Sequence, residues 1–102
     1  MNNLKKIIKP KASGKTTELI QMSHDTWTYI LVVDRKRADW IADYACNVLK
    51  IDIPNPVSIE EFINAHRSLG YCENVLIDDA DEVLQKLIGK VNIMAITMRD
   101  SD

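Results

Sequence analysis

The 102-residue sequence has few of the residues that mark disulfide-rich, zinc-binding or membrane-spanning proteins. Its two cysteines, Cys46 and Cys72, are far apart in the sequence, and it has two histidines, so neither a disulfide framework nor a zinc site is expected. We interpret both cysteines as buried free thiols. No apolar run approaches the roughly twenty residues that cross a membrane, and the N-terminus lacks the apolar core of a secretory signal. We therefore expect a cytoplasmic protein with no membrane contact.

The composition is that of a globular protein, with 46% hydrophobic and 27% charged residues. Its length predicts one domain, residues 1–102, without room for a second lobe. The charge is unevenly distributed: residues 1–51 contain nine Lys or Arg and five Asp or Glu, whereas residues 52–102 contain four and ten. This asymmetry is consistent with a polyanion near the first half, or with an ordinary solvated surface.

Apolar runs alternate with helical patterns along the chain, which is typical of the α/β class with parallel strands. Helices are expected over 15–23, 36–50, 59–67 and 81–88, and strands over 4–9, 28–34, 56–58, 74–79 and 91–98. Ser58 and Glu61 have the spacing of a capping box at a helix start. In the helix over 36–50, the apolar side chains that fall on one face are expected to pack in the core. We call them the core stripe; they are Ala38, Ile41, Ala42, Ala45, Val48 and Leu49.

The segment before the first predicted helix has the residues of a phosphate-binding loop. Backbone N–H groups at a helix start point toward a bound anion, and Gly14 lets the backbone come close to it. Lys15 can reach the β- and γ-phosphates, and Thr16 can offer its hydroxyl to Mg²⁺. The sequence therefore predicts a nucleoside triphosphate ligand, bound by Ala12, Ser13, Gly14, Lys15, Thr16 and Thr17.

A second acidic motif follows the apolar run of residues 74–77. Asp78 and Asp79 come directly after it, as expected of a buried parallel strand that brings carboxylates to its C-terminal edge. A carboxylate there can hold Mg²⁺ through water. The alternative is that Ser13 and Gly14 form an ordinary turn while the two aspartates only cap a helix.

With these two motifs the chain resembles the P-loop NTPases, Gly14-Lys15-Thr16 matching Walker A and Val75-Leu76-Ile77-Asp78-Asp79 matching Walker B. It is most similar in pattern to the first RecA-like domain of superfamily 1 helicases, and it also looks like small ATPase-like proteins of prophages. One departure is Lys9, which stands before Pro10 where the Walker A pattern has glycine. Tight wrapping of the β-phosphate is then not expected.

The resemblance implies a three-layer P-loop NTPase fold with a five-stranded parallel sheet in the order 1-5-4-2-3. The strand over 4–9 would then lie at an edge, open to a partner or to self-association into a homo-oligomer. It also implies ATP and Mg²⁺ as cofactors, with Thr16 and Asp78 as metal ligands and Lys15 and Asp79 as catalytic residues. Asp79 stands where hydrolysing relatives carry glutamate, and its side chain is shorter, which favours slow turnover; capping of the following helix is its alternative role.

Three functions are compatible with these motifs. The first is a weak or partner-dependent ATPase that acts with single-stranded nucleic acid or a larger phage-like assembly. The second is a non-catalytic interaction protein that retains the fold. The third, a type II thymidine kinase, is disfavoured because the chain lacks the zinc-bearing segment and substrate lasso of those enzymes. Trp40 and Tyr44 lie off the core stripe. Three roles are open for this pair: a partner surface, a stacking platform for bases, or packing against a neighbouring loop.

Overall fold

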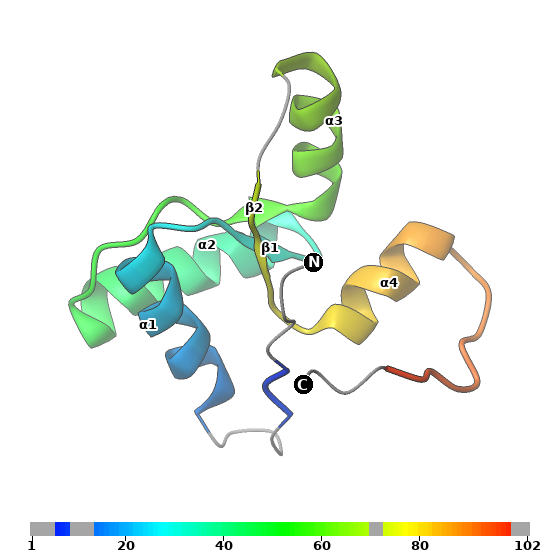
Figure 1. The fold of residues 1–102 in the computed structure, drawn as a ribbon, viewed down its shortest axis with the longest axis horizontal. Helices are drawn as coiled ribbons and strands as arrows, with labels where there is room; N and C mark the ends of the chain where they lie inside the picture. The colour runs from blue at the N-terminus through cyan, green and yellow to red at the C-terminus, as the bar shows by residue number, and fades with distance from the viewer. Residues whose placement is uncertain (1–5, 9–13, 70–72, 99–102) are drawn as a thin grey trace.

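The computed structural model describes residues 6–8, 14–69 and 73–98, and the side chains of 66–69 are not included. Helices and strands alternate along the chain (Figure 1). The elements, in chain order, are α1 (Lys15–Thr26), β1 (Ile30–Val32), α2 (Arg35–Asp43), the π-helical segment η1 (Tyr44–Leu49), β2 (Val57–Ser58), α3 (Ile59–Leu69), β3 (Leu76–Ile77) and α4 (Ala80–Ile88).

The described sheet has three parallel strands in the order β2-β1-β3. Leu31 of the central strand pairs with Val57 in β2 and with Ile77 in β3. All three residues of β1 are buried. A parallel strand covered on both faces needs a continuous apolar sequence, and the run Ile30–Val32 supplies it.

The predicted three-layer P-loop fold with a five-stranded sheet in the order 1-5-4-2-3 is wrong. Residues 91–98 lie in no strand, and neither do residues 6–8 of the strand expected over 4–9, whose other residues lie outside the described part. After α4, Gln85 donates from Nε2 to the carbonyls of Gly89 (2.8 Å) and Val91 (2.6 Å), and the chain runs around the outer side of α4 instead of along β3 (Figure 1). The predicted edge for self-association at 4–9 is correspondingly not formed by residues 6–8.

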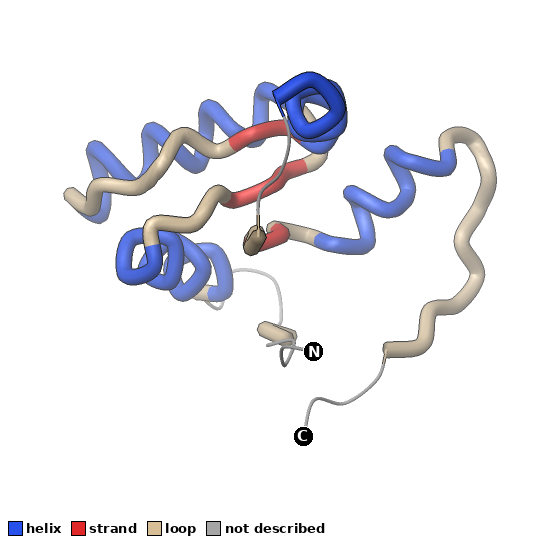
Figure 2. The backbone as a smooth tube through the Cα atoms, turned by 45° about the horizontal axis from the view of Figure 1, so that its top comes forward, coloured by secondary structure: helices blue, strands red, loops and turns tan. Residues whose placement is uncertain are grey.

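The core is divided between the two faces of β1, and Figure 2 shows the strands at the centre with helices around them. Ile30 and Val32 pack with α1, α2 and η1 in one cluster. Leu31 points the other way and packs with Ile59 of α3 and Val83 of α4. Alternate side chains of one short strand thus organise both hydrophobic clusters.

The helix predicted over 36–50 is instead α2 followed by the π-helical segment η1. A π-helical turn contains more residues than an α-helical turn, so positions beyond it rotate away from the α-helical stripe. Ala38, Ile41 and Ala45 are buried as expected, but Val48 is 60% exposed, so its assignment to the core is wrong. Cys46 is exposed rather than buried, and Cys72 lies outside the described residues.

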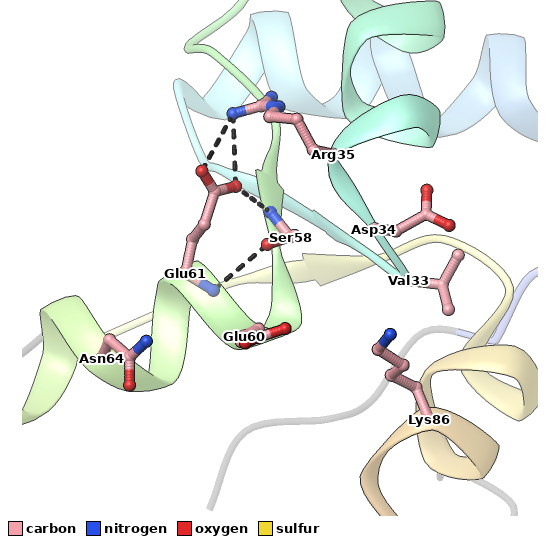
Figure 3. Close-up of a pocket in the computed structure, with 8 residues that line it drawn as sticks. All are labelled: Val33, Asp34, Arg35, Ser58, Glu60, Glu61, Asn64 and Lys86. Carbon is pink, nitrogen blue, oxygen red and sulfur yellow. Dashed lines mark hydrogen bonds and ion pairs between the residues drawn. The ribbon is translucent and has the colours of Figure 1, made fainter. Parts of the chain in front are cut away.

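The capping box at the start of α3 is confirmed. The Ser58 amide donates to Glu61 Oε1 (3.0 Å), and the Glu61 amide donates to Ser58 Oγ (3.1 Å; Figure 3). These two Ser58 contacts, the backbone bond first, lower the pKa of Glu61, and the nearby Arg35 guanidinium lowers it further. The ionised form of Glu61 is therefore the form that the fold favours.

Because its pKa is lower in the folded state, ionised Glu61 stabilises the fold fully above its unfolded pKa, about 4.3. This contribution is lost as the pH falls through the folded pKa. Glu61→Gln keeps the capping contacts but does not titrate. We expect the stability advantage of the native protein over Glu61→Gln to shrink between about pH 6 and about pH 3, as measured by urea unfolding at constant ionic strength. An advantage that does not vary with pH would contradict this assignment.

Candidate functional site

The candidate site begins at the N-terminus of α1. Gly14 precedes the helix with a φ of 88°, a left-handed conformation that favours glycine, and Lys15 and Thr16 occupy the first two helical positions. The first backbone bond inside this end runs from the Glu18 amide to the Gly14 carbonyl (3.0 Å). The amides of residues 15–17 therefore precede the intrahelical bonding pattern and point toward the space before the helix. Ala12 and Ser13 lie outside the described residues, and Thr17 is half-buried.

The acidic part of the site follows β3. The Asp78 amide donates to the Leu31 carbonyl (3.0 Å), which holds this residue beside the end of β1. The Asp78 side chain is only 4% exposed. Asp79 has a φ of 50°, in the left-handed region that aspartate tolerates better than most residues. Both carboxylates are therefore fixed by the backbone at the C-terminal edge of the sheet.

The two predicted motifs meet through charged contacts. Lys15 Nζ lies 3.3 Å from Asp79 Oδ1. Arg37 donates from Nε to Asp78 Oδ2 (2.9 Å) and from Nη2 to Thr16 Oγ1 (3.3 Å). We call these five residues, Lys15, Thr16, Arg37, Asp78 and Asp79, the charged cluster. The structure thus brings together the four predicted residues and adds an arginine between two of them.

Arg37 is not part of either sequence motif. Its position is set by Asp34, which ends the segment after β1 and accepts a hydrogen bond from the Arg37 amide (2.9 Å) as the N-cap of α2. Because β1 and β3 are neighbours, the residues that follow them lie at the same edge of the sheet. The sequence feature that indicates Arg37 is its position three residues after Asp34, the aspartate that follows the apolar run of β1.

Trp40 and Tyr44 support Arg37. Their rings stack with centroids 5.0 Å apart and an angle of 8° between planes. The Arg37 guanidinium carbon lies 4.5 Å from the Trp40 ring centroid, a cation–π distance. The pair thus places an aromatic face against Arg37, and Trp40 remains 47% exposed.

Asp79 does not cap α4 with its side chain, so the structural alternative for this residue is wrong. Its carboxylate pairs with Lys15 instead. A left-handed non-glycine residue costs folding free energy, and such residues are concentrated at functional sites. The backbone strain at Asp79 and its ion pair with Lys15 both lie in the charged cluster.

A separate cavity of about 280 Å³ lies at the ends of β1 and β2 and is shown in Figure 3. It contains no residue of the charged cluster; its lining is Val33, Asp34, Arg35, Ser58, Glu60, Glu61, Asn64 and Lys86. Arg35 is paired with Asp39 and Glu61, and Glu61 also serves the capping box. On this side of the cavity, the lining residues Arg35, Ser58 and Glu61 join the start of α3 to the start of α2.

Comparisons with protein-family models, curated proteins and solved structures gave no match. Among the described residues, no helix has the length and apolar character needed to cross a membrane. The same residues contain no group of three or more His, Cys, Asp or Glu that would hold a metal ion with protein ligands alone.

Two substitutions of Asp79 separate its charge from its backbone conformation. The Lys15–Asp79 pair is partly exposed, so Asp79→Asn should cost less than about 1 kcal/mol. Alanine also loses the tolerance for left-handed φ, and Asp79→Ala should be about 1 kcal/mol less stable than Asp79→Asn. Urea unfolding measures both. Equal stability of the two variants would show that the left-handed conformation does not constrain this position.

Proposed function

We propose that the chain binds a nucleoside triphosphate such as ATP together with Mg²⁺, through Lys15, Thr16, Asp78 and the amides of residues 14–17. The observation that carries this proposal is the bridge made by Arg37. One cationic group contacts both the Thr16 hydroxyl at the start of α1 and the Asp78 carboxylate after β3. Oxygen ligands from the two motifs therefore converge on one positive charge.

The ligand chemistry fits a hard divalent cation. Mg²⁺ is commonly held by one or two carboxylates together with the phosphate oxygens of its nucleotide, which suits a site with few protein ligands. When bound, it would neutralise the phosphate charge. Thr16 and Asp78 are the residues that would hold it, and Lys15, whose pairing with Asp79 is partly exposed, would exchange that carboxylate for the β- and γ-phosphates.

Hydrolysis in this proposal is slow or depends on a partner. Asp79 is the residue that would orient the attacking water, but its side chain is one methylene shorter than that of glutamate, and it is engaged by Lys15. An arginine supplied by another domain or subunit commonly contributes about 10³ to 10⁵ in rate. The basic first half of the chain favours single-stranded nucleic acid as a partner.

A protein-interaction role without hydrolysis is the second candidate. It is favoured by the large apolar side chains that α4 and the following segment expose, because such side chains commonly cover partner surfaces. They are Leu84, Leu87, Ile88, Val91, Met94, Ile96 and Met98. Absence of nucleotide binding would favour this candidate over the first.

Removal of Lys15 tests nucleotide binding directly. Calorimetry with ATP and Mg²⁺ should show binding to the native protein, and Lys15→Ala should weaken it by about 3 kcal/mol, roughly a hundredfold in Kd, because a charge-assisted contact to phosphate is lost. Lys36→Ala is the matched control, since it removes the same charge from an exposed position outside the cluster. Equal affinity in the native protein and Lys15→Ala would refute the assignment.

The hydrolysis rate per chain tests the dependence on a partner. We expect very slow phosphate release from ATP in dilute protein, and an increase as protein concentration rises or single-stranded nucleic acid is added, because the arginine that accelerates such reactions is commonly supplied by another domain or subunit. Phosphate release is measured alongside light scattering to establish the oligomeric state. Rapid hydrolysis by a monomer at every dilution, abolished by Lys15→Ala, would show that one chain contains the complete catalytic site.

A further inference from the structure

The Arg37 guanidinium lies where the two proposed metal ligands converge. It contacts Asp78 Oδ2 at 2.9 Å and Thr16 Oγ1 at 3.3 Å. The Asp78 side chain is 4% exposed and that of Arg37 is 29% exposed. A carboxylate this buried needs a cationic partner, and in the free protein Arg37 provides it.

The Thr16 hydroxyl and the Asp78 carboxylate cannot contact both the Arg37 guanidinium and a metal ion without weakening both interactions. A positive charge in contact with Asp78 disfavours the approach of a second positive charge, by the same repulsion that shifts the protonation of like-charged neighbours. An arginine remains charged at any pH at which the protein is folded, so the guanidinium cannot relieve this repulsion by losing a proton. It can relieve it only by moving.

Building on the proposed function, we propose that Arg37 is an internal competitor of Mg²⁺. In the free protein it holds Thr16 and Asp78 together. When the Mg²⁺–nucleotide complex binds, the guanidinium gives up both contacts, and the affinity for the divalent ion is set by this exchange.

The surroundings of Arg37 allow such an exchange without movement of α2. The Arg37 amide is held by the Asp34 side chain at 2.9 Å, so the position of the backbone does not depend on the contacts of the guanidinium. Trp40 already lies against the guanidinium, at 4.5 Å from its ring centroid to the guanidinium carbon, and is itself stacked on Tyr44. The aromatic face gives the displaced charge a favourable contact that requires neither Thr16 nor Asp78.

The first test compares ATP binding in Mg²⁺ and in EDTA, by calorimetry, for the native protein, Arg37→Met and Arg35→Met. Methionine removes the charge but keeps a long apolar side chain. The Kd in Mg²⁺ should fall about tenfold in Arg37→Met, since a neighbouring like charge typically changes such an equilibrium by at least this factor, and the Kd in EDTA should not fall, because no divalent ion is then present to bind the released carboxylate. Arg35 is on the same helix but pairs with Asp39 and Glu61, so Arg35→Met should behave like the native protein.

Each of the other possible results would contradict a particular part of the proposal. An unchanged or higher Kd in Mg²⁺ for Arg37→Met, with ATP still bound by the native protein, would overturn the competitor role and leave the proposed function intact. A Kd that falls equally in Mg²⁺ and in EDTA would show that the effect of Arg37 does not depend on the divalent ion, which also overturns it. No ATP binding by any of the three proteins would overturn the proposed function and this inference together.

A second readout does not need Arg37 to be changed, and so remains available if Arg37→Met does not fold. The chain has two tryptophans, and Trp27→Phe leaves Trp40 as the single fluorophore. Trp40 emission should change when ATP and Mg²⁺ bind, because the guanidinium against its ring changes position. Unchanged emission, under conditions where calorimetry shows ATP and Mg²⁺ bound to the same variant, would overturn the inference.

Discussion

Burial of β1 on both faces is the constraint on which the rest of the structure depends. Its three residues are at most 3% exposed, and their alternate side chains enter two different hydrophobic clusters. Helices α1 and α2 pack against Ile30 and Val32, whereas α3 and α4 pack against Leu31. The end of this strand also positions Asp34, the cap that fixes the first turn of α2. The strand β1 therefore determines both the packing of the helices and the position of Arg37.

The charged cluster is balanced rather than strongly positive. Two cationic side chains, Lys15 and Arg37, face two carboxylates, Asp78 and Asp79, in two ion pairs. An anionic ligand consequently gains less from the overall field than it would at a preformed basic cradle. Binding at such a site is an exchange of partners, in which a carboxylate released by one cation must find another. If the proposed ligands bind here, the affinity for the anion would depend on which cation accompanies it.

The sequence was most informative where structure is decided locally. The continuous apolar runs around Ile30–Val32 and Leu76–Ile77 mark parallel strands, although β1 is buried as expected whereas Ile77 of β3 is 45% exposed. The Ser58–Glu61 spacing marks a helix start whose contacts lie within one turn. An apolar run does not specify its partner, which is why residues 91–98 were mistaken for a strand that would complete a five-stranded sheet. The π-helical turn depends on packing and has no sharp sequence signal. Arg37 was missed because its contact with Asp78 joins residues 41 positions apart.

The two cations of the charged cluster lie in the first half of the sequence and its two aspartates in the second half, so they are synthesised at different times. During synthesis, the segments that carry Lys15 and Arg37 emerge well before the one that carries the aspartates, and domains fold as their segments become available. Until β3 pairs with β1, the two cations lack the carboxylates that they contact in the folded protein. The electrostatic balance of the charged cluster is therefore a property of the folded protein, and a chain that is still being made carries the two cations before it carries their carboxylate partners.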